Sequence, residues 1–167
     1  MQTGKKVSLY GLLTALAMVL SYVEAQVPPV LLPGMKLGLT NLVVLAALYR
    51  MGERQAFLLN AVRIVLVAFT FGNMSNMLYS LAGGLLSWII MCLLKKTGRF
   101  SMTGVSVAGG VAHNCGQILV AAFILETPAL ITYYLPILIL SGLAAGVLVG
   151  ILGSTIVKRL PFPEDNR

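Results

Sequence analysis

The chain has 167 residues, of which 58% are hydrophobic and 10% are charged, and its mean hydropathy is +0.92. Soluble domains are usually about a quarter charged, so these side chains are too few to cover a soluble globule, and the composition predicts a membrane protein. The net charge of +7 does not indicate a nucleic-acid partner, because the basic residues fall in short clusters between apolar segments.

The first two apolar segments differ in length. A membrane-spanning helix needs about 20 mostly apolar residues. The first segment, 7–25, follows Lys5 and Lys6 in the manner of a signal peptide, but no clean cleavage site follows, so we expect a retained helix. The second, 35–49, is short and follows a stretch rich in proline and glycine. It is therefore expected to be either tilted or a half-helix entered from the outer face.

Four further apolar segments complete the set, and they cover residues 55–71, 75–94, 104–125 and 136–157. The last is expected to begin near Pro136, because proline suits the first turn of a helix. The sequence therefore predicts an all-α bundle of six transmembrane helices over residues 1–159, followed by a short disordered tail at 160–167.

The charged residues orient this bundle. If six helices alternate, the connections on one side hold the basic residues Lys5, Lys6, Arg50, Arg54, Lys95, Lys96, Arg99, Lys158 and Arg159. The opposite connections hold one basic residue, Lys36, with Glu24 and Glu126 near helix ends. Because lysine and arginine concentrate in cytoplasmic loops, both ends of the chain are expected in the cytoplasm.

Small residues recur four positions apart on several segments, which allows helices in lipid to approach closely. The sets that we expect to pack inside the bundle are Gly142, Gly146 and Gly150; Ala108, Ala112 and Gly116; and Ser80 and Gly84. On the first segment, Gly11 and Ala15 leave two interpretations open: packing within the chain, or a face that docks a partner subunit.

Arg63 lies near the middle of the third segment, with Asn60 three residues earlier on the same helical face. Arginine keeps its charge, so inside a membrane it needs an anion, carbonyl groups or water. Two interpretations remain open. One is structural pairing, with Glu24, Glu126 or helix-end carbonyls, and the other is binding of a ligand anion such as a carboxylate or phosphate.

His113, Asn114 and Gln117 place three polar side chains within little more than one turn of the fifth segment, between glycines. His113 and Gln117 are four residues apart and share a helical face. The cluster predicts either a substrate cavity or a set of hydrogen bonds between helices.

Further candidates for substrate binding lie toward the outer side. Lys36 and Asn41 flank the start of the second segment, where the N–H groups of a short helix would point at an anion. Asn76 belongs to another outer polar loop, and Tyr79 is placed to line a cavity.

Catalytic and metal-binding patterns are missing from the sequence. There is one histidine and one aspartate, Asp165, with no Walker loop, no CxxC and no metal-ligand cluster. Cys92 and Cys115 lie in apolar segments and are expected to be buried thiols. We therefore expect no enzyme acting alone, no metal and no cofactor.

Three runs carry a resemblance to a known family: PGMKLGLTN at 33–41, YSLAGG at 79–84 and GGVAHNCGQ at 109–117. They resemble the bacterial Gx transporter family, also labelled heptaprenyl diphosphate synthase component I, over nearly the whole chain. That family is similar to the S components of energy-coupling factor transporters, which have six helices in the cell membrane and bind a vitamin-like substrate near the outer face. The resemblance implies that ATP hydrolysis comes from a coupling membrane subunit with two ATPases, which Gly11 and Ala15 would contact.

Three hypotheses follow. The first is a substrate-binding membrane subunit of an importer for a small molecule with an anionic or strongly hydrogen-bonding part. The second is an accessory membrane subunit in prenyl diphosphate or quinone synthesis, although such synthases resemble Asp-rich, magnesium-binding enzymes and this chain has a single aspartate. The third is a structural protein whose polar groups all pair internally.

Overall fold

The computed structural model describes residues 3–26 and 38–159 of the chain. Within them the backbone forms six α-helices and no strand: α1 (Thr3–Gln26), α2 (Leu39–Arg50), α3 (Glu53–Thr70), α4 (Met74–Thr97), α5 (Met102–Ile124) and α6 (Ala129–Arg159). The all-α class and the six helical segments are therefore confirmed. The predicted tail and the stretch rich in proline and glycine lie outside the described residues.

The helices differ in their capacity to cross a membrane. Four of them, α1, α4, α5 and α6, are long and apolar enough to do so, which is typical of a multi-pass membrane protein. Helix α2 is apolar but has only 12 residues. Helix α3 has 18 residues and is interrupted by charge, because it carries Glu53, Arg54 and Arg63.

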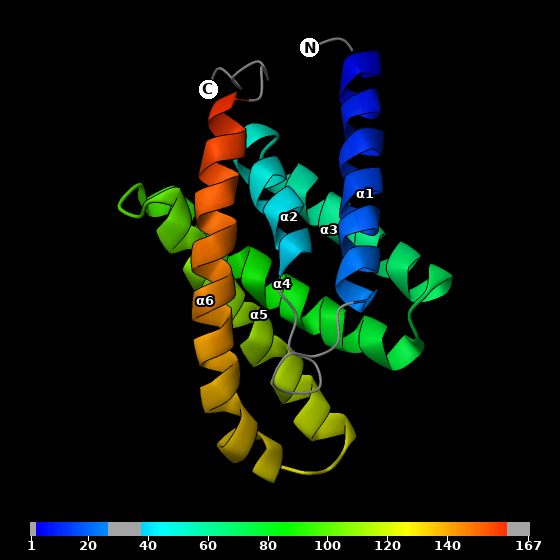
Figure 1. Ribbon diagram of the computed structural model, residues 1–167, viewed down its shortest axis with the longest axis vertical. Helices are drawn as coiled ribbons and strands as arrows, with labels where there is room; N and C mark the ends of the chain where they lie inside the picture. Colours follow the sequence, from blue (N-terminus) through cyan, green and yellow to red (C-terminus); the bar gives the residue numbers. More distant parts are fainter. Residues whose placement is uncertain (1–2, 27–37, 160–167) are drawn as a thin grey trace.

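Helices α5 and α6 run side by side as an antiparallel pair, and α4 packs against α5 (Figure 1). Helix α1 stands on the other side of the molecule, and α2 lies between α1, α3 and α6. The side chains of Leu45 and Leu48 on α2 are almost fully buried, so this short helix forms the centre of the hydrophobic core. The start of α1 and the end of α6 lie at the same end of the molecule (Figure 1).

Glycines bring the backbones of α5 and α6 into direct contact. A Cβ atom added at Gly110 would lie 2.6 Å from the carbonyl oxygen of Gly142, and one at Gly146 would lie 2.5 Å from the Cα of Val107. Helices α4 and α5 approach in the same way, since a Cβ at Gly116 would lie 2.9 Å from the Cα of Gly83. These contacts confirm the prediction that the small residues of the last three helices pack inside the bundle.

The predicted start of the sixth helix is wrong. Helix α6 begins at Ala129, and Pro136 lies inside it. The first turn forms instead after Pro128, whose carbonyl accepts a hydrogen bond from the N–H of Ile131 at 3.0 Å. Pro128 stands just before this start, at a helix end where proline is favoured. Pro136 removes one backbone donor, the partner of the Thr132 carbonyl, without ending the helix.

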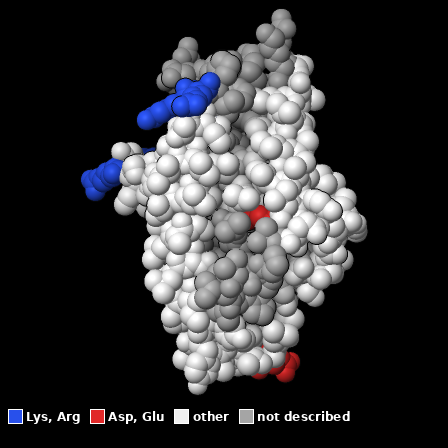
Figure 2. All heavy atoms as spheres, viewed as in Figure 1, with Lys and Arg blue, Asp and Glu red and all other residues white. Residues whose placement is uncertain are grey.

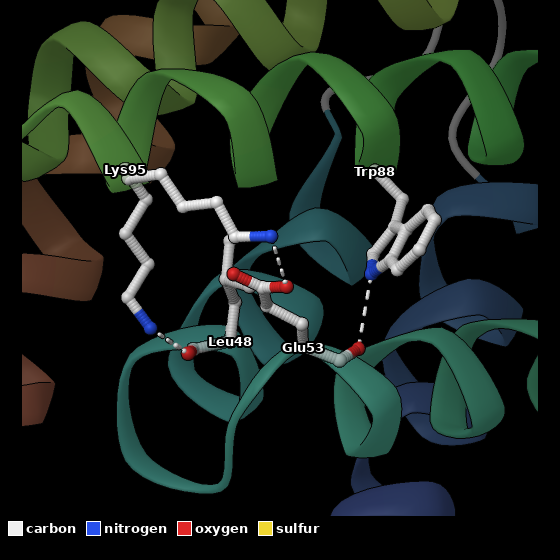
Figure 3. A network of polar contacts seen from close by, with 5 residues as sticks. Leu48, Glu53, Trp88 and Lys95 are labelled. Carbon is white, nitrogen blue, oxygen red and sulfur yellow. Dashed lines mark hydrogen bonds and ion pairs between the residues drawn. The ribbon is translucent and has the colours of Figure 1, made fainter. Parts of the chain in front are cut away.

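A polar network fixes α4 against the connection between α2 and α3 (Figure 3). The Nζ of Lys95 donates to the carbonyl of Leu48 at 2.7 Å, and the indole N–H of Trp88 donates to the carbonyl of Glu53 at 3.0 Å. The carboxylate of Glu53 pairs with Lys96 at 3.0 Å. Together these contacts set the position from which α3 starts, and so the depth at which Arg63 lies.

Charged side chains are unevenly distributed over the surface. On the face drawn in Figure 2, basic side chains gather over the end of α6 and the connection between α4 and α5. Acidic side chains appear at the opposite end, by the turn between α5 and α6, and at one spot near the middle of this face.

Candidate functional site

A cavity of about 120 Å³ lies inside the bundle, and each of the six helices contributes to its wall. Six of the nine residues predicted to bind substrate line this one cavity: Asn41, Arg63, Asn76, His113, Asn114 and Gln117. These side chains come from α2, α3, α4 and α5. The fold therefore brings together polar groups that are up to 76 positions apart in the sequence.

Arg63 supplies the positive charge of the cavity. Its side chain is 8% exposed, and one Nη atom donates a hydrogen bond to the Oδ1 of Asn60 at 2.5 Å. The Nε–H of Arg63 is buried and has no hydrogen-bond partner among the described residues. A buried donor on a charged group without an acceptor is costly, so Arg63 is stabilised if an acceptor comes within reach of its guanidinium.

Glu24 supplies the negative charge of the cavity, and the sequence predicted it only as one of several possible partners of Arg63. From the end of α1, one carboxylate oxygen accepts the N–H of Leu39 at 2.8 Å and the other accepts the hydroxyl of Thr40 at 2.7 Å. Ser21 lies 3.0 Å from the same hydroxyl. Glu24 thus binds the positive end of α2, where unpaired N–H groups favour an anion. It lines the same cavity as Arg63, whose charge attracts it.

The polar turn of α5 has a double role. His113, Asn114 and Gln117 all line the cavity. The Nδ2 of Asn114 also donates to the carbonyl of Leu138 on α6 at 2.7 Å. Asn114 therefore joins two helices at the edge of the cavity, as the interpretation of hydrogen bonds between helices predicts, and substrate binding by this cluster stays a prediction.

The remaining predicted residues lie elsewhere. Asn60 is buried behind Arg63, against Gly84 of α4, and acts on the cavity through its hydrogen bond to the guanidinium. Lys36 lies outside the described residues. Glu126, one of the partners considered for Arg63, is exposed in the turn between α5 and α6.

A second hollow of about 380 Å³, which we call the apolar groove, lies between α4, α5 and α6. Its wall is mostly apolar and includes the predicted residue Tyr79. Three of its lining residues, Asn76, Ser80 and Gln117, also line the polar cavity. The two hollows are therefore separated by no more than one layer of side chains.

Comparison with known proteins assigns a family. The profile of the family described as heptaprenyl diphosphate synthase component I matches residues 13–156. The chain belongs to this family. No curated protein and no solved structure gives a significant match. The part of the chain that matches the component I family contains every cavity residue named above, whereas Gly11 precedes it.

The family description names a component of a diphosphate synthase, a chemistry that elsewhere relies on metal ions to hold the developing charge. In the described parts of this component I chain, no three His, Cys, Asp or Glu side chains come together. Asp165 lies outside the described residues. The cavity instead presents one guanidinium, one engaged carboxylate and several amide groups, which is a set suited to binding a polar molecule.

The predicted docking residues Gly11 and Ala15 lie on the exposed side of α1. Helix α1 turns Leu13, Ala17, Ser21 and Glu24 inward, at helical spacing. A Cβ atom added at Gly11 would meet no atom within 4 Å. Around Gly11 and Ala15 this side of α1 is exposed, as a docking face requires.

Proposed function

We propose that the chain is the substrate-binding membrane subunit of an importer for a small molecule, and that it depends on a separate energising module. The observation that carries this proposal is the polar cavity inside the bundle, beside a buried arginine whose Nε–H lacks an acceptor among the described residues. A structural protein with all polar groups paired internally predicts no cavity beside Arg63 and His113, and both residues line one.

The cavity limits the size and charge of the polar part of the substrate. A water needs roughly 10–15 Å³ of such space, so 120 Å³ holds a group of roughly ten non-hydrogen atoms. The oxygens of Glu24 already accept bonds from α2, whereas Arg63 has a donor to spare. We therefore expect the substrate to present a carboxylate, a phosphate or another strong acceptor.

The orientation follows from charge. We propose that α2 and α3 also enter the bilayer, which gives six crossings in the bacterial cytoplasmic membrane and both chain ends in the cytoplasm. The basic side chains over the end of α6 and the connection between α4 and α5 support this orientation (Figure 2). The cavity walls contributed by Asn76 and Gln117 then lie in the outer half of the bundle.

The energy source is proposed to be a coupling membrane subunit with ATPases, as in energy-coupling factor transporters. The sequence contains no nucleotide-binding motif. The exposed small residues Gly11 and Ala15 on α1 offer a surface on which another helix can approach closely.

The test is to purify the chain in mild detergent and to identify small molecules that co-purify by mass spectrometry. Arg63→Ala and His113→Ala are each expected to reduce the amount retained, and Glu126→Ala, an exposed charge outside the cavity, serves as the control. If both cavity variants bind the identified molecule with unchanged affinity, the site assignment is wrong.

A second candidate is favoured by the family description: an accessory membrane subunit of prenyl diphosphate or quinone synthesis. The description names this chain's family as one component, which implies a partner component. The hypothesis predicts stable association with a soluble prenyl synthase and a change in product chain length when the chain is deleted. Isolation of a complex with an ATPase-bearing module instead would contradict it.

A further inference from the structure

The polar cavity and the apolar groove share side chains, so one ligand can be considered for both hollows. Asn76 on α4 and Gln117 on α5 face both hollows, and Ser80 lies one turn from Asn76 and does the same. A molecule held in the cavity that extends past these three side chains enters the groove.

The two hollows differ in chemistry. The cavity holds Arg63, which is more than nine-tenths buried and has an Nε–H without an acceptor in the described chain. The groove is lined by apolar side chains from α5 and α6, among them Ile118, Ala121, Leu130 and Leu138. One hollow therefore suits an anionic group and the other suits hydrocarbon.

We propose that the ligand of this site is a single-chain anionic amphiphile, with a phosphate or carboxylate head at Arg63 and an apolar tail in the groove. This inference rests on the proposed function and narrows its substrate class. Free fatty acids and alkyl or prenyl phosphates share this chemistry. Beside the cavity lies one apolar groove of about 380 Å³, to which the proposal assigns a single hydrocarbon chain, whereas a bilayer phospholipid has two.

The proposal is tested with the full chain in nanodiscs of zwitterionic phosphatidylcholine, with protein-free discs to subtract partitioning. The probes are ethyl, butyl and octyl phosphate, with octanoate for the carboxylate head and octyltrimethylammonium for the opposite charge. The affinity is expected to rise about fourfold for each buried methylene from ethyl to octyl phosphate. Octyltrimethylammonium is expected not to bind above the background.

Two variants separate head from tail. Ala121→Trp fills the groove and is expected to abolish the dependence on chain length while leaving ethyl phosphate binding unchanged. Leu119→Trp is the matched control, because Leu119 lies on the same helix, is 52% exposed and does not line the groove. Arg63→Gln is expected to weaken ethyl and octyl phosphate by the same factor, about tenfold or more. Leu130→Trp replaces Ala121→Trp if the latter does not fold.

If the affinity for alkyl phosphates rises equally with chain length in Ala121→Trp and in Leu119→Trp, the amphiphile proposal is overturned. If ethyl phosphate binding still depends on Arg63, the proposed function survives that result. Displacement of octyl phosphate when phosphatidylglycerol is added to the discs identifies the occupant as bilayer lipid and also overturns the proposal. If ethyl phosphate does not bind above protein-free discs, the anion site at Arg63 is wrong, and the proposal fails with it.

Discussion

The contact between α5 and α6 gives the sharpest test of how packing supports the cavity. A Cβ atom added at Gly146 would lie 2.5 Å from the Cα of Val107 and 3.0 Å from the carbonyl oxygen of Ser106. Carbon atoms in contact prefer about 3.5–4.0 Å, so Gly146→Ala must separate the two backbones by about 1 Å. Neither neighbour is a flexible side-chain end, so the strain cannot be relieved by a change of rotamer.

We expect Gly146→Ala to lower the free energy of unfolding by about 1–3 kcal/mol, which is the usual effect of overpacking. For a chain of this size this corresponds to a melting temperature lower by roughly 2–4 °C per kcal/mol. Because Gly142 and Ala145 on the same helix line the cavity, retention of the co-purified ligand should fall as well. The measurement is size-exclusion chromatography of detergent-solubilised protein after heating, with ligand content determined in parallel.

Gly11→Ala is the matched control. A Cβ atom at this position meets nothing within 4 Å, and alanine is favoured over glycine in a helix by about 1 kcal/mol. Its melting temperature should equal or exceed that of the wild type. If Gly146→Ala melts at the same temperature as Gly11→Ala, the close approach of α5 and α6 does not limit stability and the reasoning is refuted.

Three further predictions concern the rest of the fold. Glu24→Ala should lower the free energy of unfolding by about 1.5–3 kcal/mol, because two donors at the start of α2 lose a charged acceptor. Glu126→Ala, the control, should melt at the temperature of the wild type. Equal melting temperatures for the two variants would contradict the capping role of Glu24. Trp88→Phe should cost about 0.5–1.5 kcal/mol in a thermal melt, since it loses one hydrogen bond to the first residue of α3. In a chain whose native cysteines are replaced by alanine, an impermeant maleimide added to intact cells should label Glu126→Cys and not Arg99→Cys; the reverse pattern would invert the topology.

The existence of the helices could be predicted from sequence, but their ends could not. Long apolar runs in a membrane protein have few alternatives to helices, which is why all six segments were found. The start of α6 was missed because Pro128 and Pro136 both fit a first turn and only the local hydrogen bonds choose between them. Helix α3 was predicted despite its charged residues. Because of those residues, it is not one of the four helices that are long and apolar enough to cross a membrane.

The polar cavity could be predicted in part. Arg63 and His113 stood out because ionisable groups are rare in apolar helices, and both line the same cavity. The role of Glu24 could not be derived, because Glu24 and Glu126 were equivalent candidates until the packing of α1 against α2 was known. The apolar wall of the groove could not be predicted apart from Tyr79, since Ile118 and Ala121 resemble any other residues of a membrane helix.

The arrangement of the two charges in the cavity explains why an anionic ligand is more consistent with the site than an internal ion pair. If Glu24 turned toward Arg63, the first N–H group of α2 and the Thr40 hydroxyl would lose their acceptor inside an apolar bundle. While Glu24 stays with α2, Arg63 retains an unmet donor. In the structure each oxygen of Glu24 accepts a hydrogen bond from the start of α2, and an entering anion could serve Arg63 while that start stays capped. Ligand binding and the contact between α1 and α2 are therefore expected to stabilise one another. Glu24→Ala removes a charge that repels the anion, but it also loosens this contact. We expect the second effect to dominate, so that the variant binds the anion more weakly.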